Sequence, residues 1–176
     1  SGFRRGIPNW KSKRAIQKIK DLLDKHHGQK GVIHTSSNAQ AFWIIEKLKD
    51  YNLVFVGGED RNYTLKEFSE SDEDIVLIGA SIKDGVDFKG DLCRFQIVFK
   101  IPYPQLNEQV KYRRDLDPKW FYYQTVMALM QAYGRGIRDH DDWCVMYIID
   151  SSFKQLFDYN RGFFNEYFIE AVQKKK

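Results

Sequence analysis

One short segment combines an amide side chain and two guanidinium groups at helical spacing. Gln131, Arg135 and Arg138 follow one another at intervals of four and three residues, which would place all three on one face of a helix. Arginine suits forked contacts with phosphate oxygens, because its planar group presents several N–H donors in a fixed arrangement. The segment therefore indicates a phosphate-binding surface. A solvated basic helix end would have the same spacing, since positive charge is favoured at the C-terminus of a helix.

Two glycines, Gly134 and Gly136, interrupt this segment. Glycine inside a helix costs about 1 kcal/mol relative to alanine, because its more flexible backbone must be fixed. The pair therefore predicts either that the helix ends here or that the backbone closely approaches another group.

Hydroxyl side chains gather in a second segment, Thr35-Ser36-Ser37, between a short apolar stretch and an amphipathic one. Where a strand leads into a helix, hydroxyls and backbone N–H groups converge, which favours phosphate contact. N-capping of the next helix by Ser37 or Asn38 is the alternative, and the two roles are compatible. Ser81 and Lys83 follow another apolar stretch and are candidates of the same kind.

Aromatic and basic residues in a third segment suit single-stranded nucleic acid. Tyr103 could stack on a base, and Lys111, Arg113 and Arg114 could add positive charge. A basic surface patch without such a role is an equal alternative. The formal net charge of +4 and the pI of about 8.9 permit nucleic-acid contact without requiring it.

The hydrophobic pattern predicts the scaffold that positions these segments. Apolar stretches are typical of buried strands, and amphipathic stretches between them predict helices. We expect an α/β fold with a mainly parallel sheet of at least five strands, covered by helices on both faces. The expected strands are residues 32–36, 53–56, 74–78, 95–101 and 143–149. The expected helices are residues 13–27, 38–50, 64–71, 106–114, 120–137, 153–159 and 165–173.

The composition fits one globular domain. The chain has 176 residues, 43% of them hydrophobic, which is enough for one packed core. Residues 1–11 are expected to be a flexible N-terminus or a cloning remnant, and residues 12–176 the domain. We find no apolar run of membrane-spanning length and no signal peptide. We therefore expect a cytoplasmic protein, or a nuclear one in a eukaryote, that is not secreted and has no membrane partner.

The two cysteines, Cys93 and Cys144, are too few for a four-cysteine cluster. The four histidines show no metal-ligand spacing. We expect buried free thiols, no iron–sulfur cluster and no metal site in this chain.

Taken together, these segments resemble the motifs of superfamily 2 helicases. Gln-Ala-Tyr-Gly-Arg-Gly-Ile-Arg at 131–138 resembles motif VI of the XPD/DinG (Rad3-related) branch, and residues 31–37 resemble motif IV. Residues 84–91, followed by Arg94, resemble motif V, and Pro-Tyr-Pro at 102–104 resembles the segment after the next strand of that branch. The four segments occur in the family's order. The chain thus resembles the C-terminal, second RecA-like domain of such a helicase.

The resemblance implies one half of an ATPase site. Arg135 and Arg138 would be arginine fingers that reach the γ-phosphate of ATP, and Gln131 would help to orient them. ATP and Mg²⁺ would be held mainly by an N-terminal RecA-like domain of the same polypeptide, because the chain contains no Walker A or Walker B string.

The other residues carried over from the family's motifs would contact the nucleotide or the nucleic acid. Those near the nucleotide would be Gly85, Asp87 and Gly134. Those along a track for single-stranded nucleic acid, with DNA favoured, would be Thr35, Ser36, Ser37, Ser81, Lys83 and Tyr103.

Two further expectations concern the surroundings of the arginines. We expect Arg135 and Arg138 to point into a cleft at the carboxyl edge of the sheet, where ligands bind in open parallel sheets. If they are structural instead, Asp84 and Asp87 are their plausible internal partners. Relatives commonly carry Glu in place of Asp84, and they often carry an Arg two residues after the aspartate that corresponds to Asp150, which this chain lacks.

These features lead to two hypotheses about function. In the first, the chain is the C-terminal motor half of an ATP-dependent nucleic-acid helicase or translocase and is inactive alone. In the second, it is a non-catalytic module with a RecA-like fold that binds nucleic acid or protein. A Walker A motif upstream in the same polypeptide would favour the first.

Overall fold

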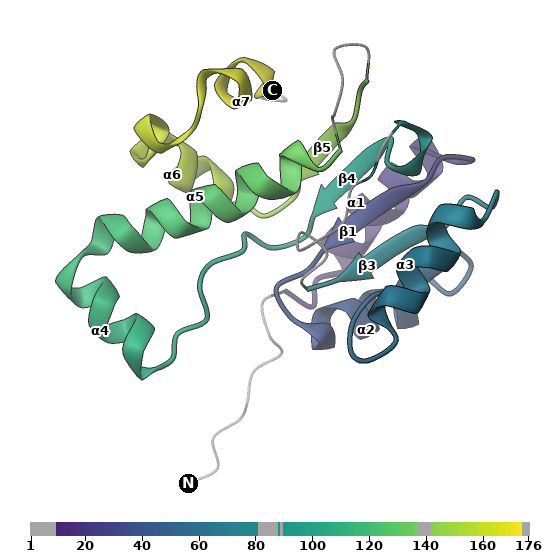
Figure 1. The fold of residues 1–176 in the computed structure, drawn as a ribbon, viewed down its shortest axis with the longest axis horizontal. Helices are drawn as coiled ribbons and strands as arrows, with labels where there is room; N and C mark the ends of the chain where they lie inside the picture. The colour runs from purple at the N-terminus through teal and green to yellow at the C-terminus, as the bar shows by residue number, and fades with distance from the viewer. Residues whose placement is uncertain (1–9, 81–87, 89, 137–141, 174–176) are drawn as a thin grey trace, which may run out of the picture.

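Five parallel strands form one sheet in the computed structural model, which describes residues 10–80, 88, 90–136 and 142–173 (Figure 1). Their order across the sheet is β2-β3-β1-β4-β5, and every neighbouring pair is parallel. This confirms the predicted parallel α/β architecture. The strands are β1 (Gly31–His34), β2 (Leu53–Phe55), β3 (Val76–Gly79), β4 (Phe95–Val98) and β5 (Val145–Ile148).

Helices cover both faces of the sheet (Figure 1). They are α1 (Lys13–Lys25), α2 (Asn38–Lys47), α3 (Arg61–Glu70), α4 (Glu108–Leu116), α5 (Pro118–Gly134), α6 (Ser152–Tyr159) and α7 (Glu166–Ala171). Buried Ile33 and Ile97 pack in one core with α1 and α2. Their sequence neighbours point to the other face of the sheet. There, Val32 packs with α3 and Val98 packs with α5. Because both faces are buried, the strands appear in the sequence as continuous apolar stretches.

The longest described helix, α5, begins and ends at residues that explain its limits. Pro118 lies in its first turn, where a missing N–H costs nothing, and the Asp117 side chain accepts from the backbone N–H of Trp120 (3.2 Å). The helix ends at Gly134, with Arg135 as its C-cap. The prediction that this helix continues to residue 137 is therefore wrong, and a helix end at the glycines, one of the two alternatives, is confirmed.

The helix α4 lies away from the sheet and meets the N-terminal end of α5 (Figure 1). None of its residues is buried. Asn107 caps it by accepting from the backbone N–H of Val110 (2.8 Å). The α4–α5 hairpin therefore projects from the domain and exposes the basic residues of α4 to solvent. In the described part of the chain, no helix combines the length and the apolar character needed to cross a membrane.

Candidate functional site

The hydroxyl residues after β1 lie at the carboxyl edge of the sheet. Thr35 is buried; its N–H donates to the Gly79 carbonyl (3.0 Å) and its Oγ1 donates to the Ser37 carbonyl (3.1 Å). Ser37 is the N-cap of α2 and accepts from the backbone N–H of Gln40 (3.4 Å). The capping role that the sequence left open is therefore present. Ser36 is the exposed member of the group.

Gln40, which was not predicted as a site residue, closes this turn. Its side chain is buried, and its Oε1 accepts from the backbone N–H (3.0 Å) and the Oγ (3.1 Å) of Ser36. Ser37 and Gln40 have the Ser-x-x-Gln spacing of a capping box, in which the glutamine turns back to the start of the helix. That spacing was the available signal, and the contact fixes the path of the chain into α2.

Tyr103 follows β4 at the same edge. Its ring stacks on that of Phe121, with 5.8 Å between centroids and 10° between planes. The side chain is 37% exposed, and burial of the rest raises the pKa of its hydroxyl. A ring that is already held in place loses little side-chain freedom on stacking with a base.

Asp150, two residues after the end of β5, joins the ends of β4 and β5. Its carboxylate accepts from the backbone N–H groups of Ile101 (3.0 Å) and Ser152 (3.1 Å), and it pairs with Lys100 (3.4 Å). Burial alone would raise the pKa of Asp150, but these N–H groups and the Lys100 ammonium lower it below its usual value. This aspartate therefore has a structural role that does not need the arginine missing after it.

The basic side chains of α4 make local contacts. They are Arg113 with the Trp120 ring (4.4 Å), Arg114 with Asp115 (2.9 Å) and Lys111 with Glu108 (3.5 Å). Exposed pairs of this kind contribute little to stability, so they do not prevent these side chains from contacting the phosphates of a nucleic-acid backbone. Both alternatives for this cluster stay open.

The segment with Gln131 and Arg135 lies at the opposite, amino edge of the sheet. The helix α5 is antiparallel to the strands, so its end at Gly134 lies beside the start of β5 (Figure 1). The Arg135 carbonyl accepts from the N–H of Phe88 (3.3 Å), and Arg135 takes part in a further interaction within the chain. The expectation that Arg135 lies at the carboxyl edge is wrong, because a residue that precedes a parallel strand reaches the strand's amino end.

Two residues of this segment are at the surface. Gln131 and Gly134 are exposed on the last turn of α5, and Arg135 is half-buried. No heavy atom lies within 4 Å of the position that a Cβ would take on Gly134. Gly134 therefore serves as a helix end and makes no close approach.

Gly136, in contrast, makes the close approach that the sequence offered as the second alternative. A Cβ on Gly136 would lie 2.6 Å from both Cys144 Sγ and Gln96 Nε2. Gln96 is 1% exposed, and its Oε1 contacts the His34 ring nitrogen Nε2 (2.8 Å). This buried amide was not predicted, since a single Gln within an apolar strand carries no functional pattern. It connects the end of β1 to the backbone beside Arg135.

Several predicted residues lie outside the described part of the chain, so their roles stay predictions. They are Ser81, Lys83, Gly85, Asp87 and Arg138, together with the alternative partner Asp84. Phe88, which is described, is buried and meets the ring of Phe68 edge-to-face at 5.9 Å.

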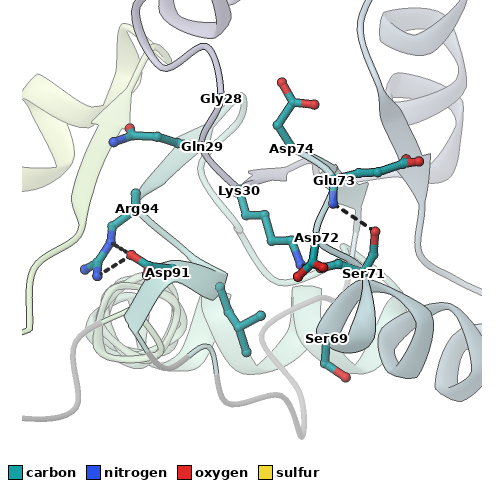
Figure 2. Close-up of a pocket in the computed structure, with 11 residues that line it drawn as sticks. Gly28, Gln29, Lys30, Ser69, Ser71, Asp72, Glu73, Asp74, Asp91 and Arg94 are labelled. Carbon is teal, nitrogen blue, oxygen red and sulfur yellow. Dashed lines mark hydrogen bonds and ion pairs between the residues drawn. The ribbon is translucent and has the colours of Figure 1, made fainter.

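A hollow of about 810 Å³ also opens at the amino edge (Figure 2). Two basic side chains on its wall are already bonded. Lys30 Nζ donates to the carbonyls of Phe68 (2.6 Å) and Ser71, and Arg94 pairs with Asp91 (2.7 Å). The carboxylates that line it are Asp72, Glu73, Asp74 and Asp91. With its cations bonded and its wall acidic, the hollow disfavours a phosphate group.

No three His, Cys, Asp or Glu side chains converge in the described residues to hold a metal ion. Cys93 is a buried free thiol, as expected, and Cys144 is partly exposed.

Comparison with known sequences identifies the family. The helicase C-terminal domain family matches residues 10–168. The Fanconi anemia group J protein homolog of Gallus gallus is 31% identical over 93 residues, which are 46% of this chain and 7% of that protein. The ATP-dependent DNA helicase DinG of Salmonella choleraesuis is 30% identical over 131 residues, which are 66% of this chain and 18% of that protein. The chain thus spans less than a fifth of either relative's length.

Solved structures agree on the fold. An XPD helicase superposes with a TM-score of 0.67 at 18% identity, over 84% of this chain and 29% of that one. The C-terminal domain of the DEAD-box protein Dbp5 gives a TM-score of 0.58 at 14% identity, over 84% of this chain and 79% of that one. At these identities the structures establish a RecA-like fold. With nearly its whole length matched, the chain belongs to the helicase C-terminal domain family, in the XPD/DinG branch of superfamily 2.

Proposed function

We propose that this chain is the C-terminal motor half of an ATP-dependent DNA helicase or translocase, in which Arg135 and Arg138 act as arginine fingers. The observation that carries the proposal is the hydrogen bond from Phe88 to the Arg135 carbonyl (3.3 Å). It joins the segment that resembles motif V to the segment that resembles motif VI, although they are far apart in the sequence. Such a connection would hold the two segments in place beside one nucleotide.

The surroundings of Arg135 fit contact with a phosphoryl group supplied from outside the chain. Its backbone is held between the end of α5 and Gly136, which packs tightly on Gln96 and Cys144. A rigid backbone that carries a long cationic side chain can present charge with little reorganisation. Gln131, one helical turn earlier, would help to orient that charge.

ATP, when bound, supplies the γ-phosphoryl group that is transferred to water. Arg135 and Arg138 would offset the negative charge that grows on that group in the transition state, an effect worth about 10³–10⁵ in rate for such fingers. Gly134 would let the backbone lie near the nucleotide, as would Gly85 and Asp87 in the preceding loop.

The phosphate cradle and the Mg²⁺ ligands would belong to an N-terminal RecA-like domain of the same polypeptide. The chain contains no Walker A or Walker B string. It also spans only 18% of the DinG relative and 7% of the Fanconi anemia group J relative, so both relatives have room for such a domain.

The carboxyl edge would carry part of the track for single-stranded DNA. Exposed Ser36 and the start of α2 suit a backbone phosphate, and the Tyr103 ring suits a base. Thr35 and Ser37 would shape this surface through their hydrogen bonds, and Ser81 and Lys83 would extend it. DNA is favoured over RNA because the relatives reported above include a DNA helicase.

The test is ATP hydrolysis by the longer polypeptide and by this chain alone. The longer polypeptide should hydrolyse ATP when single-stranded DNA is added, and the isolated chain should not. The isolated chain should bind single strands weakly, with an affinity that falls steeply as salt rises, because few phosphates are neutralised. DNA-stimulated hydrolysis by the isolated chain, or its absence from the longer polypeptide, would contradict the proposal.

A further inference from the structure

The two cysteines of the chain contact each other just before the neighbouring strands β4 and β5. Cys93 Sγ and Cys144 Sγ are 3.8 Å apart. The Val145 N–H donates to the Arg94 carbonyl (3.1 Å), which continues the β4–β5 ladder to the residues beside both cysteines. The two sulfurs therefore already face each other, and a disulfide needs them to approach from 3.8 Å to about 2.0 Å.

The two thiols differ in access and in acidity. Cys93 is 0% exposed, whereas Cys144 is partly exposed. The contact with Cys93 lowers the pKa of Cys144, with help from Gln96 Nε2 at 3.7 Å, even though burial acts in the opposite direction. The same contact, together with burial, raises the pKa of Cys93. Cys144 is therefore both the first to ionise and the one that a reagent in solution can reach.

We propose that Cys93 and Cys144 form an oxidisable dithiol, in which a hydroperoxide reacts first with Cys144 and Cys93 then closes a disulfide. The Cys144 sulfur attacks the peroxide, so that an S–O bond forms, the O–O bond breaks, and the departing oxygen takes up a proton to leave as an alcohol or water. Cys93 then attacks the Cys144 sulfur; the S–S bond forms, the S–O bond breaks, and the hydroxide leaves as water with the Cys93 proton. Two thiols are oxidised and one hydroperoxide is reduced.

The disulfide would act on the segment that carries Arg135. Cys144 Sγ is one of the two atoms nearest to the position that a Cβ on Gly136 would take (2.6 Å), so it supports this part of the backbone. Closing the sulfur pair from 3.8 Å to a bond of about 2.0 Å removes part of that support. The backbone of Arg135 and Gly136 should move with it, and a displacement of about 1 Å can cost about a hundredfold in turnover. This consequence rests on the proposed function, whereas the thiol chemistry does not.

The first experiment adds hydrogen peroxide to the folded, reduced 176-residue chain. Intact mass and peptide mapping without reductant should show a monomer that has lost two hydrogens, with the Cys93 and Cys144 peptides joined. Cys93→Ala should leave a sulfenic acid on Cys144 that dimedone traps. Cys144→Ala should react at least about tenfold more slowly, because the remaining thiol is buried. In denaturant the two variants should react at similar rates.

Four outcomes would overturn the dithiol. They are oxygen added to Cys144 without a crosslink, a crosslink between chains, no oxidation at all, and Cys144→Ala reacting as fast as Cys93→Ala. The crosslink in the unmodified chain needs no substitution, so a variant that fails to fold does not remove the test.

The second experiment measures ATP turnover by the longer polypeptide before oxidation, after it, and after reduction again. Turnover should fall about a hundredfold on oxidation and return with reductant. The Cys93→Ser/Cys144→Ser double variant keeps an atom at each sulfur position but cannot form the crosslink, so the same treatment should leave its turnover unchanged, which controls for oxidation elsewhere. Unchanged turnover in crosslinked protein would overturn the effect on Arg135. No turnover in the reduced protein would instead overturn the proposed function and leave the crosslink result standing.

Discussion

The two edges of the sheet are built in different ways. At the carboxyl edge, polar side chains are bonded to the fold itself: Thr35 to the Ser37 carbonyl, and Asp150 to the backbone of Ile101. At the amino edge, backbone contacts and tight packing hold the Arg135 segment, through Phe88 and Gly136, while Arg135 itself stays half-buried. The difference teaches that the carboxyl edge is fixed through its polar side chains, whereas the Arg135 segment is fixed through its backbone. We therefore expect the amino edge to control ATP turnover and the carboxyl edge to control DNA affinity.

The largest effect should come from Arg135→Ala in the longer polypeptide. Single-turnover ATP hydrolysis should fall by about 10³-fold or more, because a finger acts mainly on the transition state. ATP affinity and the thermal melt should change far less. Arg138→Ala should behave in the same way.

Arg161→Ala is the matched control for these variants, since Arg161 is an exposed arginine that contacts the Phe157 ring (5.4 Å). It should leave turnover within a few-fold of the parent. If Arg135→Ala and Arg138→Ala behave like this control, the finger assignment is wrong and the non-catalytic module becomes the better hypothesis.

The next-largest effect is on stability, and it should differ between the two glycines of this segment, Gly136 and Gly134. Gly136→Ala would put a Cβ 2.6 Å from Cys144 Sγ and Gln96 Nε2, which should destabilise the fold by about 1–3 kcal/mol through overpacking. Gly134→Ala meets no atom within 4 Å and should stabilise the helix end by up to about 1 kcal/mol. Urea unfolding of the isolated chain measures both. Equal effects of the two substitutions would show that Gly136 does not pack as described.

A smaller effect is expected at the carboxyl edge. Ser36→Ala should raise the DNA concentration that gives half-maximal ATPase stimulation by roughly three- to tenfold, the equivalent of about one lost hydrogen bond. Turnover at saturating DNA should be unchanged. Ser69→Ala is the control, because this exposed serine bonds the Lys66 carbonyl (2.8 Å) beside the acidic hollow. A loss of turnover at saturating DNA would mean that the two edges are not separate in function.

The smallest effect concerns acid stability. The pKa of Asp150 is lowered in the fold, so its contribution to stability is present above the unfolded pKa of about 4 and is lost as pH falls through the lower folded pKa. Asp150→Asn should therefore flatten the dependence of the unfolding free energy on pH below about pH 4. Urea unfolding at a series of pH values measures this slope. An unchanged slope would show that the pKa of Asp150 is the same in the folded and unfolded states.

The sequence predicted the fold well because parallel strands buried on both faces leave a clear pattern. Continuous apolar stretches such as Val76–Gly79 cannot belong to a half-exposed sheet. Strand ends were predicted less well, since the mainly apolar pattern of residues 95–101 continues to Ile101, yet β4 ends at Val98. Beyond that point the Ile101 N–H bonds Asp150 instead of a neighbouring strand, a tertiary contact that no local pattern contains.

The candidate site could be predicted by residue type but not by place. Gln131 and Arg135 were identified from their spacing, while the edge assigned to Arg135 was wrong, because the rule for ligand sites in open sheets concerns loops that leave strands. Gln96 was missed because only burial beside His34 and Gly136 gives its amide a role. Half of the proposed ATP site would also lie on a different domain, so the sequence of this one cannot position it.

The central position of β1 has a consequence for how the chain folds during synthesis. Of the five strands β1 is made first, yet Gly31 pairs with Val76 on one side and with Phe95 on the other. The apolar strand β1 therefore stays unpaired at both of its hydrogen-bonding edges until β3 and β4 have left the ribosome. Pairings between such distant segments form slowly, and the waiting strand is prone to association with other chains. The nascent chain should accordingly need shielding by chaperones until β4 is complete, and shortening it before β4 should give aggregation in place of a smaller fold.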